Sequence, residues 1–487
     1  MGLVSLTVAL PLAGALLLAL TRLTERGAKA AAMATSLVTF VASVAMLAGF
    51  DRSEAGFQLA ESTVWIPAIG ANLSFAVDGI SLVLILLTTF LTPLILLASW
   101  DSIHDRVRAY LIAFLVLEGA VLGVFAATDV LLFYVFFEFS LVPMYLIIGI
   151  WGGSGRRYAA VKFFLYTLFG GLLMLVAILV LYSRTGSFAY EAFRTLALEP
   201  STQMWLFGAF LVAFAVKVPL FPVHTWLPDA HTEAPTGGSV FLAGVLLKMG
   251  TFGLLRYGLP IFPEATAAFA PWLAVIAVIG ILYGAVVALM QSDIKRLIAY
   301  SSVSHMGFVV LGMFALNATA VSASVVQMVN HGLSTGALFL LIGFLYERRH
   351  TRQIAAFGGL AAKVPVLAGL WLVVSLSSLA LPGLNGFVGE FPILLGTFQR
   401  WPAVAVAASF GAVLAALYLL WAYQRIFHGP LESADNANTR DLNRREIGVI
   451  APLVVAIVLI GVYPKPMFDL VGPSVDRVLA EVQEGTR

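Results

Sequence analysis

One stretch decides the fold of this 487-residue chain: Trp205-Leu-Phe-Gly-Ala-Phe-Leu-Val-Ala-Phe-Ala-Val-Lys217-Val-Pro219-Leu-Phe-Pro222-Val-His224-Thr-Trp-Leu-Pro228-Asp229-Ala-His231. Lys217 follows a dozen apolar residues, and a charge inside a bilayer costs at least about 2.5–3.5 kcal/mol. Pro219 and Pro222 remove backbone donors, so the helix breaks within a turn or two of the lysine. Broken backbone at membrane depth must be buried in protein or line a wet cavity. The charge and the break together indicate an ion path.

The composition identifies a polytopic membrane protein. Hydrophobic residues make up 60% of the chain and charged residues 11%, against about 45–50% and about 25% in soluble domains. The chain has no cysteine, which excludes thiolate ligands for an iron–sulfur cluster, a disulfide and a c-type haem attachment. We therefore expect no cofactor in this chain, with any electrons moving in a partner. A net charge of +2 gives no indication of a nucleic-acid surface.

Apolar runs of about 17–25 residues predict an all-α protein with about 14 transmembrane helices. The predicted helices lie near Gly2–Leu20, Ala30–Phe50, Gly79–Ser99, Arg108–Ala127, Val130–Trp151, Ala159–Tyr182, Met204–Leu220, Gly238–Tyr257, Pro271–Met290, Arg296–Leu316, Val321–Tyr346, Val364–Ala380, Ala403–Phe427 and Glu446–Val462.

The seventh and twelfth of these helices are predicted to be discontinuous. The seventh resumes after Pro228, and the twelfth resumes at Gly386–Gly396 after Pro382-Gly-Leu-Asn385. Interrupted helices in corresponding positions are typical of an inverted repeat with an ion site at its centre. We expect a single membrane domain (1–487) with two inverted five-helix repeats, helices 4–8 in 108–257 and helices 9–13 in 271–427. N-terminal helices occupy 1–107, and a C-terminal helix and tail occupy 446–487.

Most lysines and arginines outside the helices fall in the loops that follow odd-numbered helices. Because such loops face the cytoplasm, both termini are expected on the non-cytoplasmic side. The chain opens without a targeting segment, which favours the inner (plasma) membrane of a bacterium over an organelle.

Ionisable residues form a layer near the membrane midplane. With a rise of about 1.5 Å per residue, six of them lie about 12–20 Å from the start of their helices, in a core about 30 Å thick. They are Glu118, Glu138, Lys217, Lys248, His305 and His331. Glu390 follows the second break by a few residues and is expected at the same level.

Each of these residues alone has a structural interpretation, because a single buried histidine can simply bond to a carbonyl. Seven ionisable groups at one depth favour proton transport instead. A Glu138–Lys217 pair that forms and breaks would switch proton affinity. His224, with Asp229 and His231, either joins the path or satisfies loose backbone groups at the first break. Asp78, Asp129 and Asp293 precede helices and are interpreted as caps; no histidine pair has a metal-ligand spacing on one helix face.

Five motifs resemble the antiporter-like membrane subunits of respiratory complex I, and within them the M type (mitochondrial subunit 4). They are Phe136-Phe-Glu138-Phe-Ser-Leu-Val-Pro143-Met-Tyr, Lys217-Val-Pro-Leu-Phe-Pro-Val-His-Thr-Trp-Leu-Pro-Asp-Ala-His-Thr-Glu-Ala-Pro-Thr236, Leu246-Leu-Lys248-Met-Gly, Asp293-Ile-Lys-Arg-Leu-Ile-Ala-Tyr-Ser-Ser-Val-Ser-His305-Met-Gly and Gly386-Phe-Val-Gly-Glu390-Phe. The resemblance covers nearly the whole chain.

The resemblance implies a role for each residue. Glu138 and Lys217 would be the pair of the first half-channel, Lys248 the central relay and Glu390 the exit of the second half-channel. His305 and His331 would connect centre to exit, with Glu118 as a secondary acid. It also implies coupling to quinone reduction elsewhere in an NADH:quinone oxidoreductase. L-type and N-type antiporter-like subunits and lipids would be the neighbours, with NADH, FMN, iron–sulfur clusters and quinone in partner subunits.

Three other functions fit the same residues. The chain could belong to a cation/proton antiporter or a membrane hydrogenase, it could brace a membrane arm without a channel of its own, or it could hold a quinone. Dependence on sodium favours the first, tolerance of charge-removing substitutions the second, and labelling by a quinone analogue the third.

Overall fold

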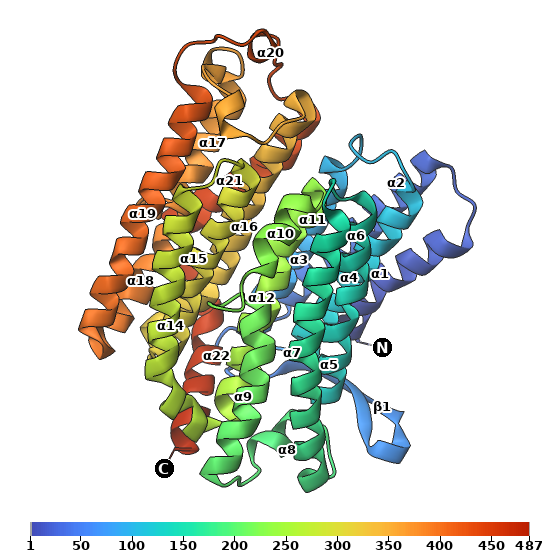
Figure 1. Ribbon diagram of the computed structural model, residues 1–487. Coiled ribbons are helices and arrows are strands. Elements are labelled where there is room, and N and C mark those ends of the chain that lie inside the picture. Colours follow the sequence, from blue (N-terminus) through green and yellow to red (C-terminus); the bar gives the residue numbers. More distant parts are fainter. Residues whose placement is uncertain (1, 487) are drawn as a thin grey trace.

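A computed structural model describes residues 2–486, most of which lie in helices (Figure 1). The first half contains α1 (Leu3–Leu20), α2 (Glu25–Ala48), α3 (Gly79–Ala98), α4 (Val107–Ala126), α5 (Val130–Phe139), α6 (Leu141–Trp151), α7 (Arg156–Thr185), α8 (Tyr190–Arg194), α9 (Pro200–Lys217), α10 (Trp226–Glu233), α11 (Thr236–Phe241), α12 (Leu247–Gly253) and α13 (Leu259–Ile261). The second half contains α14 (Pro263–Leu289), α15 (Ile294–Phe314), α16 (Ala318–Arg349), α17 (Pro365–Ser378), α18 (Asn385–Arg400), α19 (Pro402–Phe427), α20 (Ala434–Ala437), α21 (Arg444–Val462) and α22 (Lys465–Glu484).

Among residues 2–486, twelve helices are long and apolar enough to cross a membrane. They correspond to every predicted helix except the seventh and the twelfth, and those two are interrupted. The all-α membrane fold and both breaks are therefore confirmed. The total of fourteen stays a prediction because it counts each interrupted helix as one span, and so do the inversion of the repeats and the domain boundaries.

The two interruptions have the cause that the sequence indicates. Helix α9 ends at Lys217, the chain turns through Pro219 and Pro222, and α10 begins at Trp226. Helix α17 ends at Ser378, and α18 begins only at Asn385. Trp226 Nε1 donates to the Val216 carbonyl oxygen at 2.8 Å, which satisfies one backbone acceptor that the first break leaves free.

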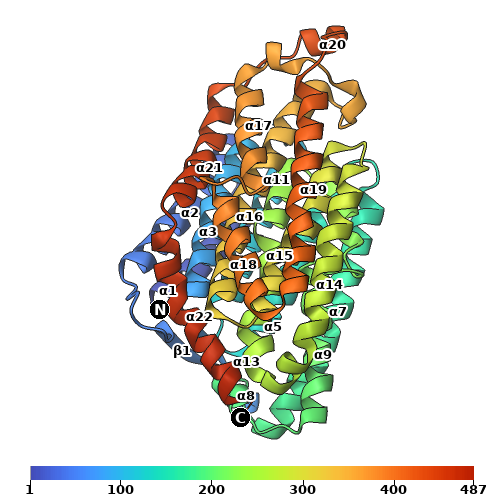
Figure 2. The same ribbon diagram turned by 90° about the vertical axis from the view of Figure 1, so that its left-hand side faces the viewer.

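Helix α16 runs through the middle of the second half and contacts α15, α17, α18, α21 and α22. It is 32 residues long, and its central part is buried throughout. The views in Figures 1 and 2 place it between the helices of the two halves. Polar side chains on α16 can therefore reach partners from both halves of the chain.

The predicted helix caps are confirmed. Asp78 accepts from the Ser81 amide and forms a capping box at the start of α3. Asp129 accepts from the Leu132 amide of α5, and Asp293 accepts from two amides of α15. These aspartates satisfy backbone donors that the first turn of a helix leaves free.

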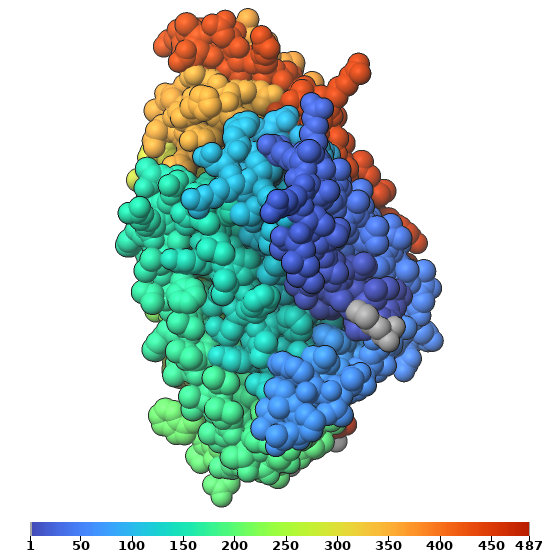
Figure 3. All heavy atoms as spheres, turned by 90° about the vertical axis from the view of Figure 1, so that its right-hand side faces the viewer, coloured from blue at the N-terminus to red at the C-terminus, as the bar shows by residue number. Residues whose placement is uncertain are grey.

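A two-stranded antiparallel hairpin follows α2 and was not predicted. Its strands are β1 (Gln58–Ile66) and β2 (Ala71–Val77). The hairpin lies at the lower surface in Figure 3, in a lighter blue than the first two helices. Its strands form no long apolar run in the sequence, because β1 is short and mostly exposed.

Helix α22 was predicted only as a tail, but it is an amphipathic helix packed across α3 and α16. Leu470, Val471 and Val475 face the bundle, and Ser474 Oγ accepts from the Gly79 amide at 2.9 Å. Figure 2 shows α22 crossing the lower half of the molecule, toward the end where α8 lies.

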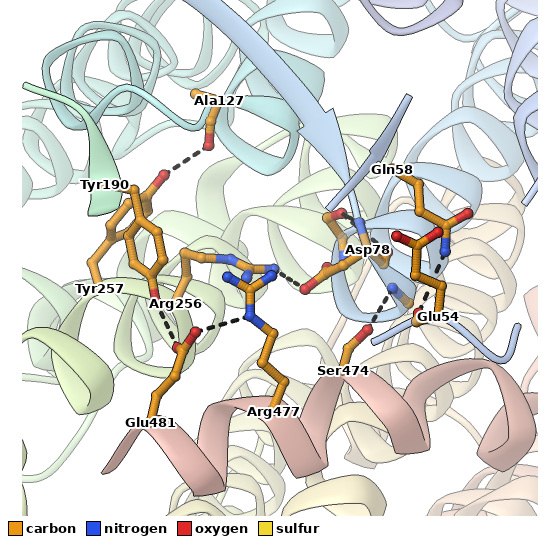
Figure 4. Close-up of polar contacts among 12 residues, drawn as sticks. Glu54, Gln58, Asp78, Ala127, Tyr190, Arg256, Tyr257, Ser474, Arg477 and Glu481 are labelled. Atoms are coloured by element: carbon orange, nitrogen blue, oxygen red, sulfur yellow. Dashed lines mark hydrogen bonds and ion pairs between the residues drawn. The ribbon is translucent and has the colours of Figure 1, made fainter. Parts of the chain in front are cut away.

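Arg256, near the end of the predicted helix Gly238–Tyr257, is buried in the structure. It lies in a π-helical turn (Leu254–Gly258), is 4% exposed and forms an ion pair with Asp78 (Figure 4). In the same cluster Tyr190 donates to Glu481 at 2.9 Å, and Arg477 Nε lies 2.9 Å from Glu481. The cluster therefore fastens α22 and α8 to the same end of the bundle.

Candidate functional site

The predicted ionisable layer lies inside the helical bundle. Seven of its eight residues are at most 3% exposed: Glu118 (α4), Lys217 (α9), His224 (between α9 and α10), Lys248 (α12), His305 (α15), His331 (α16) and Glu390 (α18). Glu138 (α5) is half-buried. Seven different helices and one break thus bring together groups that are spread over more than half of the sequence.

Glu390 and His305 make the closest contact in the second half. Glu390 Oε1 lies 2.7 Å from His305 Nδ1 and accepts from Gln327 Nε2 at 3.0 Å. The other ring nitrogen, Nε2, lies 3.2 Å from the Tyr418 hydroxyl. The imidazole of His305 is therefore held between a carboxylate and a phenol, a position from which it can pass a proton between two partners.

Lys248 is the centre of the layer. Its Nζ lies 2.7 Å from His331 Nδ1 and also donates to the Ala243 carbonyl oxygen. The rings of His331 and His305 are 6.1 Å apart between centroids. A line of side chains thus runs from Lys248 through the two histidines to Glu390, with one gap between the imidazoles.

The helix that carries Lys248 has unusual geometry on both sides of the lysine. A π-helical turn (Leu242–Leu246) precedes α12, and a second one (Leu254–Gly258) follows it. Ala243, whose carbonyl accepts from Lys248, belongs to the first of these turns. Single π-helical turns in α-helices occur frequently at functional sites. Here the wider turn brings a backbone acceptor within reach of the lysine.

The expected direct pair of Glu138 and Lys217 is not formed in the structure. No ion pair within 4.0 Å joins them, and neither Glu138 Oε1 nor Lys217 Nζ has a hydrogen-bond partner among the described residues. Lys217 Nζ instead lies 4.8 Å from the ring centroid of Phe137, the residue before Glu138. In this structure the lysine thus packs on an aromatic ring and forms no ion pair with Glu138.

Two glycines set the space around this pair. A Cβ atom at Gly171 of α7 would fall 1.7 Å from Glu138 Oε1, so only glycine leaves room for the carboxylate. A Cβ at Gly250 of α12 would lie 3.0 Å from Lys217 Cβ and 2.9 Å from the Phe214 carbonyl oxygen. Gly250 therefore lets α9 and α12 approach closely, two residues from Lys248.

Besides Glu138 and Lys217, two more predicted site residues make no hydrogen bond to the layer. Among the described residues, neither Glu118 oxygen and neither His224 ring nitrogen has a hydrogen-bond partner. The His224 ring packs on Phe221, with centroids 5.7 Å apart. Asp229, in α10 just after the break, forms a 2.7 Å ion pair with Lys162.

Two further polar residues, Gln327 and Tyr418, belong to the layer and were not predicted, whereas His231 was expected either to join the path or to satisfy loose backbone groups. Gln327 and Tyr418 contact Glu390 and His305, as described above, but neither carries a charge that would attract attention in an apolar helix. His231 is fully buried and stacks on Phe339 with centroids 4.6 Å apart. Its ring nitrogens have no hydrogen-bond partner in the part of the chain that the structure describes.

Within residues 2–486, no three His, Cys, Asp or Glu side chains gather as ligands for a metal ion. The layer instead contains carboxylate, ammonium and imidazole groups. Each type exchanges protons, and each is held between apolar walls. The arrangement can therefore relay protons across the bundle.

The chain matches two protein families over most of its length. Residues 127–415 match the family model of the NADH:quinone oxidoreductase/Mrp antiporter transmembrane region, and residues 12–123 match the amino terminus of NADH-ubiquinone oxidoreductase chain 4. NADH-quinone oxidoreductase subunit M of Rhodobacter capsulatus is 46% identical over 97% of this chain and 96% of its own length. NADH-ubiquinone oxidoreductase chain 4 of Arabidopsis thaliana is 45% identical over 92% and 90%.

Solved structures share the fold. A chain of respiratory complex I from Thermus thermophilus with bound NADH superposes with a TM-score of 0.90 at 34% identity, covering 98% of this chain and 99% of that one. A chain of the Mrp complex from Dietzia sp. superposes with a TM-score of 0.83 at 22% identity, covering 98% of this chain and 52% of that one. The second match demonstrates only a common fold.

Proposed function

We propose that this chain, which belongs to the subunit M (chain 4) family of NADH-quinone oxidoreductases, conducts protons along its buried layer of glutamate, lysine and histidine side chains. It is an antiporter-like, membrane-arm subunit of complex I, beside other antiporter-like subunits. One observation carries the proposal: Lys248, His331, His305 and Glu390 follow one another through the core, with direct contacts at both ends of the line.

The transfer begins at Glu138 and Lys217. Quinone reduction elsewhere in the complex changes the charge at an adjoining subunit and thereby disturbs this pair. Lys217 then passes its proton toward Lys248, from which it moves through His331 and His305 to Glu390 and is released. Water that enters at the two helix breaks carries the steps for which no direct contact exists.

The finer assignments belong to the same proposal. The subunit lies in the plasma membrane of a bacterium, with both termini on the non-cytoplasmic side. L-type and N-type antiporter-like subunits flank it, while NADH, FMN, the iron–sulfur clusters and quinone are bound by partner subunits. The positive loops and the absence of cysteine support this assignment.

The test replaces Glu138 with Gln and Lys217 with Ala in the intact complex. Proton translocation per NADH oxidised is measured in closed vesicles, and assembly is checked by the amount of purified complex. Lys363→Ala, which removes an exposed lysine, is the matched control. Both site variants should lose most proton-coupled activity while assembling normally. Normal pumping in either one contradicts the proposal.

Sodium separates the proton pump from a cation/proton antiporter. For a proton pump, the translocation rate is independent of Na⁺ when ionic strength is held constant. A requirement for Na⁺ would instead favour the antiporter function.

A further inference from the structure

An apolar groove lies on the outside of the bundle, away from the ionisable layer. It has a volume of about 290 Å³ and is formed by α2, α3, α16, α21 and α22. Phe40 and Leu47 of α2, Leu87 and Phe90 of α3 and Met467 of α22 are among the residues that line it. Five elements from both ends of the chain build it, so the groove forms only in the complete fold.

The groove opens toward the membrane. On one side, Val41 and Val44 of α2 are 65% and 42% exposed, and on the other side Val455 and Leu459 of α21 are 55% and 61% exposed. Exposed valines and leucines on transmembrane helices face lipid chains or another apolar surface. Figure 2 shows α2, α3, α21 and α22 next to one another on the left of the molecule.

Arg52 is the charged residue that lines the groove. It follows the end of α2 by four residues and is therefore at the level of the membrane boundary. Among residues 2–486 no acidic side chain lies within ion-pair distance of its guanidinium. The adjacent Asp51 accepts from the Ser53 amide and hydroxyl at 2.8 and 2.7 Å.

A second cation lies near the groove. Lys465 precedes Pro466, which lines the groove, and is 68% exposed. It forms an i,i+4 pair with Asp469 at 2.5 Å. An exposed pair of this type contributes little and exchanges partners readily. An anionic group at the mouth of the groove could therefore bind Arg52, which has no acidic partner among the described residues, and Lys465, whose pair with Asp469 is weak.

We propose that this groove is a specific site for an anionic phospholipid of the complex. One acyl chain lies in the apolar groove, and the phosphate is bound by the guanidinium of Arg52 with Lys465 nearby. The planar guanidinium matches a phosphate with two parallel hydrogen bonds. The buried methylene groups of the acyl chain add to the binding free energy. The charge of the headgroup therefore determines which class of lipid binds, and the apolar groove binds the acyl chain.

The charge at the mouth favours a lipid over a protein segment. A protein helix placed in the groove would bury the unpaired guanidinium against apolar side chains, which is unfavourable without an acidic partner. A phospholipid carries an apolar chain and an anionic phosphate in one molecule. Its chain lies in the membrane core and its phosphate at the membrane boundary, where Arg52 is.

The experiment uses the whole complex in detergent. Phospholipids that remain bound after repeated detergent washing are quantified by mass spectrometry in the wild type, in Arg52→Gln and in Ala456→Phe, which places a ring inside the groove. Arg184→Gln is the matched control, because Arg184 is also exposed, lies in the last turn of the apolar helix α7 and is outside the groove. A photoreactive residue at position 456 identifies the occupant directly in assembled complex.

Arg52→Gln should reduce the retained anionic phospholipid at least fivefold, on the order of the loss of one charge-assisted contact. Ala456→Phe should remove the lipid, Arg184→Gln should retain it, and the photoreactive residue should label a phospholipid. Equal retention in Arg52→Gln and wild type, or no preference for anionic over zwitterionic lipid, would overturn the proposal. An adduct with a neighbouring polypeptide at position 456 would do the same.

Discussion

Lys248 Nζ lies 2.7 Å from His331 Nδ1, although 83 residues separate the two along the chain. This contact joins the helix that packs against Lys217 to the long central helix α16. It is the point where the two halves of the ionisable layer meet.

Tyr418→Phe tests the second half of the layer. The substitution removes the hydroxyl that lies 3.2 Å from His305 Nε2 and leaves the ring in place. A lost hydrogen bond of about 0.5–1.5 kcal/mol lowers the translocation rate by about 2- to 10-fold if His305 carries the proton. NADH-driven proton uptake measures the effect. Tyr423→Phe, on the same helix but partly exposed, is the control, and equal rates in the two variants would remove Tyr418 from the path.

Gly171→Ala tests the space around Glu138. The added methyl group would fall 1.7 Å from Glu138 Oε1, so the carboxylate must move away from its present position. We expect a loss of translocation comparable to that of Glu138→Gln, in a complex that still assembles. Gly208→Ala on α9 is the control, since a Cβ there meets no heavy atom within 4 Å. Full activity in Gly171→Ala would show that the position of the carboxylate is unimportant.

Arg256→Gln tests the ion pair with Asp78, whose side chains are 4% and 2% exposed. Removing the arginine leaves a buried, uncompensated carboxylate and should cost about 3–5 kcal/mol of stability. Thermal inactivation of the purified complex, followed by the recovery of intact subunit, measures this loss. The double variant Asp78→Asn/Arg256→Gln should be more stable than the single one. If the double variant were less stable than Arg256→Gln, the pair would not account for the loss of stability.

Glu61→Gln tests a contact between the hairpin and α1 that depends on pH. Burial alone raises the pKa of Glu61, but hydrogen bonds from the Ser5 hydroxyl and from the amides of Gly2, Val4 and Ser5 outweigh it and lower the pKa below 4.5. Folding therefore favours the carboxylate. Its contribution is complete above the unfolded pKa and is lost as pH falls through the lower folded pKa.

Hydrogen exchange at the Val4 and Ser5 amides, corrected for the intrinsic rates, measures this dependence between about pH 3 and 6. In the wild type, the protection of these two amides from hydrogen exchange should decrease as the pH falls toward 3. In Glu61→Gln the side chain does not titrate, so protection should be independent of pH. The same acidic loss in both proteins would assign the effect to another group.

Part of the site follows from the sequence because a charge in a membrane helix is costly in any fold. Lys217, Lys248 and Glu390 were identified by this argument alone, and prolines after Lys217 located the first break. Gln327 and Tyr418 carry no charge, and nothing in the sequence marks them. Their role depends on packing between α15, α16, α18 and α19, which brings distant residues together.

The contacts between residues of the layer could not be predicted from the sequence either. The spacing of charges predicted a pair of Glu138 and Lys217, but the ring of Phe137 lies next to the lysine. Arg256 lies at the end of the predicted helix Gly238–Tyr257 and nothing in the sequence indicates its burial, whereas a π-helical turn carries it into the bundle. The hairpin and α22 were missed because neither is a long apolar segment.

The measurement that tests the central claim most directly is proton translocation per electron pair in Lys248→Met, in closed vesicles that contain the intact complex. Lys363→Met, which removes an exposed lysine outside the layer, is the control. The side chain of methionine fills the space of lysine but holds no proton, so translocation should fall at least about tenfold while the complex still assembles. A ratio of protons to electrons equal to that of the wild type would contradict a path through Lys248.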